Sequence, residues 1–317
     1  MRQLYKILAV SCVGLAMTFT SLPLATDVLA KEVKVNKQQL SPETTVYSDG
    51  RVADLSDVSN QKGVVKEPKN TGAYVPSFKG TGELKPSTGS ITSNAIGITS
   101  IIGNDDRTKV TNTTSFPYSA VVHIQSDIGQ CTGWMIGPHT VATAGHCIYN
   151  TSTDRWASWA RVYPGKNGSS NPYGYANATG FRSVIGWTQN HNHEYDYGAI
   201  QLDQNIGNST GWFGYRWQSW SYVGESETVV GYPGDKDSGT TMWKHKDKIG
   251  KETSEKLYYQ NDTIGGQSGS PIWQTRSECG ECSIGVHAYG ASGGYNSGTR
   301  ITEAKFNNFT NWKNEPL

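Results

Sequence analysis

Three short motifs carry side chains that together could activate a serine hydroxyl. In chain order they are Thr143-Ala-Gly-His-Cys147, Asp196-Tyr-Gly-Ala-Ile200 and Gly265-Gly-Gln-Ser-Gly-Ser270. A serine hydroxyl is a weak nucleophile at neutral pH, so it needs an imidazole to accept its proton and a carboxylate to orient that imidazole. The motifs therefore predict acyl transfer in which Ser268 attacks, His146 acts as base and then as acid, and Asp196 orients the imidazole.

Each of the first two motifs also has an ordinary structural interpretation. A histidine beside a cysteine is more often structural, but His146 lies in a turn of small residues after an apolar pair, where a side chain can be aimed into a cleft. An alternating apolar run begins at Tyr197 and places Asp196 at the mouth of a buried strand. This position favours Asp196 over the other acids considered, which are Asp154, Asp203, Asp235, Asp237 and Asp262.

The glycine-rich motif around Ser268 is a tight turn between two apolar segments or, alternatively, a flexible loop. A tight turn can aim the backbone N–H groups of Gly266 and Ser268 at one point, as an oxyanion hole requires. Ser270 is the rival nucleophile, and the glycines on both sides of the Gln267-Ser268 pair favour Ser268.

The segments that must position these side chains look like short strands. From residue 115 onward, runs rich in Val, Ile, Tyr and Trp, such as 120–124, 228–232 and 283–287, alternate with Gly, Asn, Pro and Asp clusters. This all-β pattern favours an antiparallel barrel or sandwich, with residues 301–312 as a closing C-terminal helix. The chain order His, Asp, Ser is the order of chymotrypsin-like β-barrels and differs from that of subtilisins and α/β-hydrolases.

The composition divides the chain into three parts. Residues 1–30 have a basic start, an apolar run and a small residue at Ala30, which predicts a signal peptide and export; a membrane anchor is the alternative. Residues 31–99 are rich in Lys, Thr, Ser, Gly and Pro and predict an extended or disordered propeptide, with a functionless linker as the alternative. All ten Trp and seven His follow residue 100, so residues 100–317 can build one core.

The net charge of +1 gives no field that would recruit nucleic acid or an anionic membrane, and we expect neither as a partner. Four cysteines follow the signal segment, an even number that favours disulfides in an exported chain; the sequence alone allows three pairings.

The chain resembles a known family, the bacterial glutamyl endopeptidases of bacillary and staphylococcal type. The resemblance covers about residues 100–312 and includes the three motifs, the Cys131 and Cys147 pair, the run Gly231-Tyr-Pro-Gly-Asp-Lys236 and the run that starts at Asp106. It implies two six-stranded antiparallel β-barrels of chymotrypsin type and a secreted, monomeric serine endopeptidase that cleaves protein or peptide substrates after Glu, less readily after Asp.

The resemblance also assigns the specificity pocket. A histidine and a threonine bind the substrate carboxylate in this family, and they match His287 and Thr263. An imidazolium can donate a charge-assisted hydrogen bond to a carboxylate, and a hydroxyl can donate a second bond. In trypsins an acid just before the catalytic serine receives the new α-ammonium group; Gln267 stands there and carries no charge. The staphylococcal relatives instead use the freed amino group in the pocket, which points to Ser100 here.

The family disulfide implies Cys131 with Cys147, which leaves Cys279 with Cys282 in a tight turn that departs from the family pattern. His191, His193 and Glu194 are a possible metal patch, but so short a spacing is more often a solvated loop, and we predict neither a catalytic metal nor a cofactor. Thr99 is not acidic, so another protease is expected to activate the chain. The rival hypotheses are an inactive binding protein or adhesin of the same fold, and a same-fold protease of other specificity.

Overall fold

The computed structural model describes residues 40–53, 63–88, 94–95 and 100–317. The predicted signal peptide, residues 1–30, lies outside the described residues, and the predicted propeptide is described only in part.

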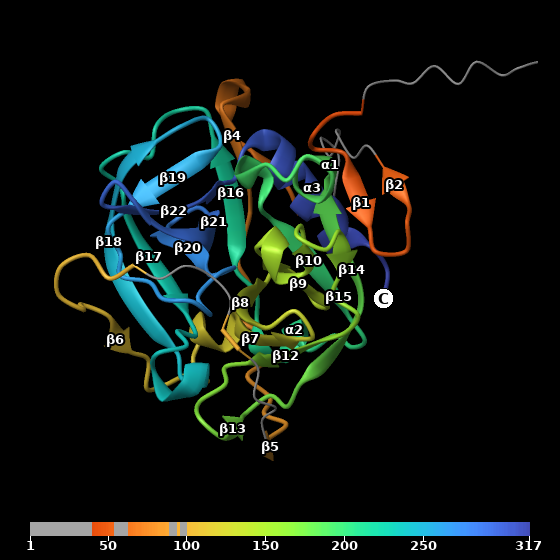
Figure 1. Cartoon of the computed structure of the whole chain (residues 1–317), viewed down its shortest axis with the longest axis vertical. Helices are drawn as coiled ribbons and strands as arrows, with labels where there is room; N and C mark the ends of the chain where they lie inside the picture. The colour runs from red at the N-terminus through yellow and green to blue at the C-terminus, as the bar shows by residue number, and fades with distance from the viewer. Residues whose placement is uncertain (1–39, 54–62, 89–93, 96–99) are drawn as a thin grey trace, which may run out of the picture. The chain divides into compact units, whose positions relative to one another are not determined.

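The first barrel closes six strands in the order β12-β7-β8-β9-β15-β14, with β14 returning to β12. Its strand β7 is buried on both faces; Val121, Val122 and Ile124, from the predicted strand 120–124, are fully buried. Figure 1 shows this barrel in yellow and green. Its strands are β7 (Val121–Ser126), β8 (Gln130–Met135), β9 (Thr140–Thr143), β12 (Ala160–Pro164), β14 (Ala176–Val184) and β15 (Gly198–Leu202).

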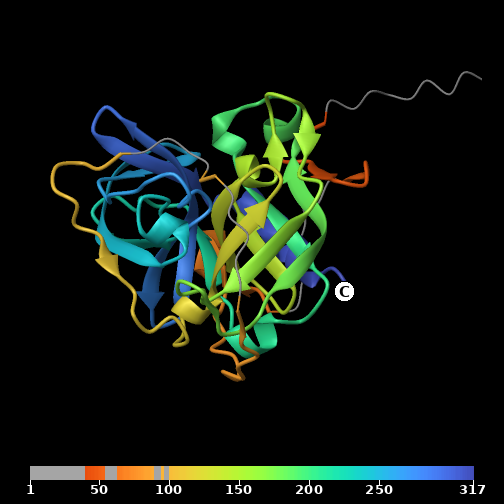
Figure 2. The same cartoon turned by 60° about the horizontal axis from the view of Figure 1, so that its bottom comes forward.

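The second barrel also closes six strands, in the order β20-β17-β18-β19-β22-β21, with β21 returning to β20. Figure 2 shows it in cyan and blue from a second direction. The two closed antiparallel barrels confirm the predicted fold. The strands are β17 (Ser226–Gly231), β18 (Trp243–Glu252), β19 (Lys256–Tyr259), β20 (Pro271–Arg276), β21 (Gly280–Ser292) and β22 (Tyr295–Arg300).

The predicted C-terminal helix is α3 (Glu303–Asn314), which begins after the cap Thr302. Phe306, Phe309 and Trp312 are buried, and the Phe309 ring packs edge-on against Trp134 of β8 at 6.0 Å between centroids. None of the helices within the described ranges is both long and apolar enough to cross a membrane.

Segments from the predicted propeptide add strands to both sheets. β1 (Thr45–Tyr47) pairs with β14 and with β2 (Val52–Ala53), and β4 (Gly72–Val75) pairs with β16 (Gly214–Gln218) and with β3 (Val65–Lys66). Two buried cations of the later chain bind carboxylates from these segments: Lys305 contacts Glu43 at 3.0 Å and Arg216 contacts Glu67 at 2.7 Å.

The remaining elements are short. β16 runs parallel to β21, and β6 (Thr108–Lys109) pairs with β18. Two small hairpin-like pairs join β10 (Tyr149–Asn150) with β11 (Arg155–Trp156) and β5 (Ser87–Thr88) with β13 (Ser170–Asn171). The short helices are α1 (Ile185–Thr188), α2 (Gly207–Thr210), η1 (Pro68–Asn70), η2 (Tyr118–Ala120), η3 (Gly145–Cys147), η4 (His193–Tyr195) and η5 (Asp237–Gly239).

Candidate active site

His146 and Asp196 meet because the strands beside them pair. His146 lies in η3 just after β9, Asp196 immediately precedes Tyr197 and β15, and the two strands pair with Thr143 opposite Gly198. His146 Nδ1 is 2.7 Å from Asp196 Oδ2, and the His146 backbone N–H donates to Asp196 Oδ1 at 2.9 Å. Since an ionised carboxylate only accepts, Nδ1 carries the ring proton and Nε2 is left as a proton acceptor.

The Asp196 carboxylate is fully buried, yet it is held ionised. Burial alone would raise its pKa, but the positive charge that His146 carries when its ring is protonated, the hydrogen bonds of His146 and a hydrogen bond from the Tyr289 hydroxyl together lower that pKa below the ordinary value. Tyr289 lies on β21, so the second barrel contributes to orienting a carboxylate of the first. No feature of the local sequence around Tyr289 indicated this contact.

The Ser268 turn is anchored against the first barrel. The Ser268 carbonyl accepts from the Thr132 N–H at 2.9 Å and lies 3.6 Å from Cys147 Sγ, beside the His146 turn. Gly269 has a φ of +88°, and a Cβ there would lie 2.1 Å from the Thr132 carbonyl oxygen. Only glycine fits this approach.

His146 and Ser268 are not hydrogen-bonded to each other in this structure. Within the described ranges, His146 Nε2 makes no hydrogen bond, including none to Ser268 Oγ. Catalytic hydrogen bonds are often long or misaligned without substrate and tighten when it binds. The rival Ser270 is fully buried, and a Cβ added at Gly231 would lie 2.2 Å from its hydroxyl oxygen, so that hydroxyl is enclosed by the protein.

The backbone N–H groups of Gly266 and Ser268 donate no hydrogen bond to any residue that the structure describes. The intervening Gln267 instead fixes the turn, because its N–H donates to the Ile264 carbonyl at 3.0 Å and its side-chain oxygen accepts from the Ile264 N–H at 2.9 Å. Gly266 adopts a φ of +98°, which allows the turn to leave both N–H groups without an acceptor in the protein.

The three predicted pocket residues lie around this turn. The His287 N–H donates to the Ser270 carbonyl at 2.9 Å, which places His287 beside the Ser268 turn. The Ser100 N–H donates to the Thr263 carbonyl at 3.0 Å, so the predicted mature start lies against the second pocket residue. Thr263 Oγ1 is buried and has no hydrogen-bond partner among the residues of the described ranges.

The charge of His287 differs from the expectation of an imidazolium. Burial, with the nearby positive charges of His146 and Lys256, lowers the pKa of His287 to about 3. The ring is therefore neutral at pH 7 in this structure, because desolvation disfavours its charged form. A neutral ring can still donate one hydrogen bond to a carboxylate.

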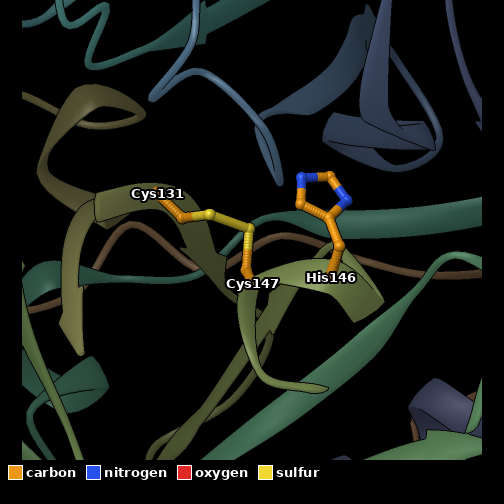
Figure 3. Close-up of side chains that lie close together, drawn as sticks. All are labelled: Cys131, His146 and Cys147. Atoms are coloured by element: carbon orange, nitrogen blue, oxygen red, sulfur yellow. A yellow bond between two sulfur atoms is a disulfide. The ribbon is translucent and has the colours of Figure 1, made fainter. Parts of the chain in front are cut away.

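The structure joins the four cysteines in the two predicted pairs. Cys131 is joined to Cys147, with 6.0 Å between Cα atoms, and Cys279 is joined to Cys282, with 5.9 Å. Figure 3 shows the first disulfide beside the His146 side chain, which leaves the same turn as Cys147. The bridge thus ties the histidine turn to β8.

Other candidate residues are engaged elsewhere. The residues weighed as a possible metal patch, His191, His193 and Glu194, do not bring their ligand atoms together in the described structure, and His191 instead contacts Asp154. The competing acids also have partners away from His146: Asp203 binds Asn177, Asp235 binds Arg107, Asp237 binds Lys109, and Asp262 binds the backbone of Ile102 and Asp106.

Residues 105–313 match the protein family described as Trypsin. The chain belongs to the trypsin family of serine proteases. It is 48% identical over 285 residues to the glutamyl endopeptidase of Bacillus licheniformis, covering 86% of this chain and 89% of the relative. A solved structure of a Glu endopeptidase in complex with MPD superposes with a TM-score of 0.63 at 35% identity, covering 68% of this chain and all of that one.

A second relative, from Bacillus subtilis, is 42% identical over 285 residues and covers 87% of this chain and 88% of its own; it is called an extracellular metalloprotease. Among the described residues, two clusters of this trypsin-family protease have side chains of the types that bind metal ions, and in each cluster some of the ligand atoms already have other partners. Cys131 and Cys147 form a disulfide, and both Asp262 carboxylate oxygens accept backbone N–H groups. The chain is a serine endopeptidase, not the inactive binding protein considered as a rival.

Two sequence runs that carried the family resemblance meet in this protease. Arg107 is fully buried and binds Asp105 at 2.8 Å and Asp235 at 2.6 Å. Lys236 binds Asp105 at 2.9 Å. These ion pairs hold the segment after Ser100 against the loop that follows β17.

Proposed function

We propose that this protease cleaves peptide bonds through a Ser268 acyl-enzyme, with His146 as the general base and Asp196 as its orienting group. The observation that carries this proposal is the 2.7 Å contact between His146 Nδ1 and the buried Asp196 carboxylate. It leaves Nε2 as the acceptor on the ring, the state needed to take a proton from a serine hydroxyl and return it to the leaving amine.

The tetrahedral intermediate places negative charge on the former carbonyl oxygen. The N–H groups of Gly266 and Ser268 belong to one turn and have no acceptor in the described protein, so they are the donors for this oxyanion. Such preorganised donors stabilise the charge as it develops.

The substrate residue before the cut is Glu, less readily Asp. Thr263 and His287 support this specificity, because Thr263 Oγ1 is a buried hydroxyl without a partner among the described residues and the His287 backbone is hydrogen-bonded to the turn that carries Ser268. The glutamyl endopeptidase of Bacillus licheniformis and the solved Glu endopeptidase structure support it by resemblance. Ser100 lies against Thr263, so a new α-ammonium group there would add positive charge to the pocket.

The chain is exported and then activated by another protease. Residues 1–30 would be removed at export and residues 31–99 at activation, giving a secreted, monomeric enzyme that starts at or near Ser100. The relative from Bacillus subtilis is called extracellular, which supports this localisation.

A panel of peptide substrates that differ only in the residue before the cut tests the specificity. We expect the highest kcat/KM for Glu, a lower value for Asp and much lower values for Gln and Leu. Equal values for Glu and Gln would refute recognition of the carboxylate. The same assay in EDTA should show undiminished activity, and loss of activity that zinc restores would refute a mechanism without a catalytic metal.

A further inference from the structure

Tyr259 contacts the pocket histidine from inside the second barrel. Tyr259 on β19 and His287 on β21 both lie next to β22, and the Tyr259 hydroxyl oxygen is 2.6 Å from His287 Nδ1. The tyrosine is fully buried, and the histidine is 3% exposed. This hydrogen bond is therefore shielded from water. Which of the two groups donates it determines which ring nitrogen of His287 carries the proton.

The surroundings of Tyr259 decide which group donates. His287 Nδ1 is the only hydrogen-bond partner of the Tyr259 hydroxyl among the described residues. If Nδ1 carried the proton, the buried phenol O–H would have no acceptor, which costs more than an ordinary hydrogen bond contributes. Burial and the nearby Glu227 raise the pKa of Tyr259 well above its usual value, so the phenol keeps its proton. The phenol donates, and Nδ1 accepts.

The ring proton of neutral His287 must then sit on the other nitrogen. His287 Nε2 makes no hydrogen bond within the described chain and is not among its enclosed unpartnered atoms. This nitrogen is therefore not wholly enclosed by the protein. The His287 backbone brackets the Ser268 turn, since its carbonyl accepts from the Gly269 N–H at 2.7 Å and its N–H donates to the Ser270 carbonyl.

We propose that Tyr259 is a positioning residue of the specificity pocket: it holds His287 in the Nε2–H tautomer, so that this N–H donates to the side-chain carboxylate of the substrate Glu. The inference rests on the proposed Glu specificity. It explains how a buried imidazole that is neutral at pH 7 serves a carboxylate pocket, because the required donor is fixed by a hydrogen bond instead of by a positive charge. It also gives the interior of the second barrel a direct role in substrate choice.

The tautomer can be read directly by NMR. Long-range ¹H–¹⁵N correlation spectra of the full chain carrying Ser268→Ala, which prevents self-digestion, distinguish the two ring nitrogens, and the His287→Asn variant identifies the signals. We expect an unprotonated Nδ1 and a protonated Nε2 in the parent, and a mixture of both tautomers in Tyr259→Phe. An Nδ1–H tautomer in the parent, or an unchanged pure Nε2–H tautomer in Tyr259→Phe, would overturn the proposal.

Tyr222→Phe is the matched control. Tyr222 is fully buried in the same apolar cluster as Tyr259, and its hydroxyl has no hydrogen-bond partner in the part of the chain that is described. The chemical change and the burial are the same, but no histidine is involved. We expect this variant to leave the His287 tautomer unchanged; a tautomer shift as large as that of Tyr259→Phe would mean that loosened packing is responsible and would overturn the proposal.

Kinetics with Ser268 intact separate this inference from the specificity on which it rests. Tyr259→Phe should lower the ratio of kcat/KM for Glu over Gln substrates by about tenfold, mainly through a higher KM for Glu, as expected for loss of one hydrogen bond. Tyr222→Phe should leave the ratio unchanged. A parent enzyme that does not prefer Glu would refute the specificity and the substrate part of this inference. If Tyr259→Phe keeps the parent's preference for Glu, the role of Tyr259 is refuted while the Glu specificity of the enzyme stands.

Discussion

Asp262 offers a quantitative test of how the segment after Ser100 is held against the pocket. Its side chain is fully buried, and Oδ1 accepts from the Ile102 N–H at 2.7 Å while Oδ2 accepts from the Asp106 N–H at 2.8 Å. In Asp262→Asn, one acceptor oxygen becomes an NH₂ group that faces an N–H donor. One hydrogen bond to a charged group is lost and one backbone donor is left unsatisfied, so we expect a loss of about 3 kcal/mol in the free energy of unfolding.

The measurement is urea unfolding of Asp262→Asn in a Ser268→Ala background, followed by tryptophan fluorescence. Asp203→Asn is the control, because Asp203 also accepts two hydrogen bonds, from the N–H and the side-chain amide of Asn177, but is exposed. Its loss should stay below about 0.5 kcal/mol. Equal stabilities of the two variants would refute the idea that Asp262 anchors the segment.

Three further predictions concern the site and its supports. Tyr289→Phe removes the hydroxyl that donates to Asp196 and should lower kcat by about tenfold with little change in KM; an unchanged kcat would show that the contact is idle. Because the pKa of Asp196 is lowered below its ordinary 3.8, its stabilising contribution is complete above that value and is lost as the pH falls through the lowered pKa. Unfolding of the Ser268→Ala protein measured from about pH 5 to pH 2 should therefore show a steeper loss of stability than the same protein carrying Asp196→Asn, and identical slopes would contradict it. Replacing both Cys131 and Cys147 by Ser opens a loop of 16 residues and should cost about 3 kcal/mol in thermal or urea unfolding, whereas an unchanged midpoint would mean that the bridge adds nothing.

Much of the fold and of the candidate site could be predicted because its signals are local. His146, Asp196 and Ser268 each lie in a short sequence motif. Strands such as β7 correspond to apolar runs in the sequence that are flanked by turn-forming residues. The C-terminal helix was indicated by Phe306 and Phe309, which lie three residues apart on its buried face. Such local patterns predict the structure correctly because, in natural sequences, the local preference of a segment agrees with its packing in the fold.

The supporting residues could not be predicted in the same way. Tyr289 and Asp196 are 93 residues apart in sequence and meet because the two barrels pack together. Tyr259 and His287 are 28 residues apart and meet because the strands that carry them both pair with β22. A tyrosine in a β-strand is most simply a core residue, and nothing in its neighbours reveals a hydrogen-bond partner on another strand.

The segment from residue 40 to residue 88 shows a second limit. Its composition indicates a chain that cannot bury enough surface to fold alone, yet β1 and β4 are ordered strands at the edges of sheets built by later residues. Their strand partners β14 and β16 lie about 140 residues away along the chain, and Lys305, which binds Glu43 just before β1, lies 262 residues from it. Amino-acid composition predicts whether a segment can fold by itself, but it does not predict pairing with strands that are distant in the sequence.

The central claim is that one serine hydroxyl is activated by the imidazole that Asp196 orients. Treatment with a serine-directed acylating inhibitor, followed by peptide mass spectrometry, tests it most directly. The account predicts a single adduct on Ser268 that disappears in His146→Ala. An adduct on Ser270, or labelling of Ser268 that persists at the same rate in His146→Ala, would contradict it.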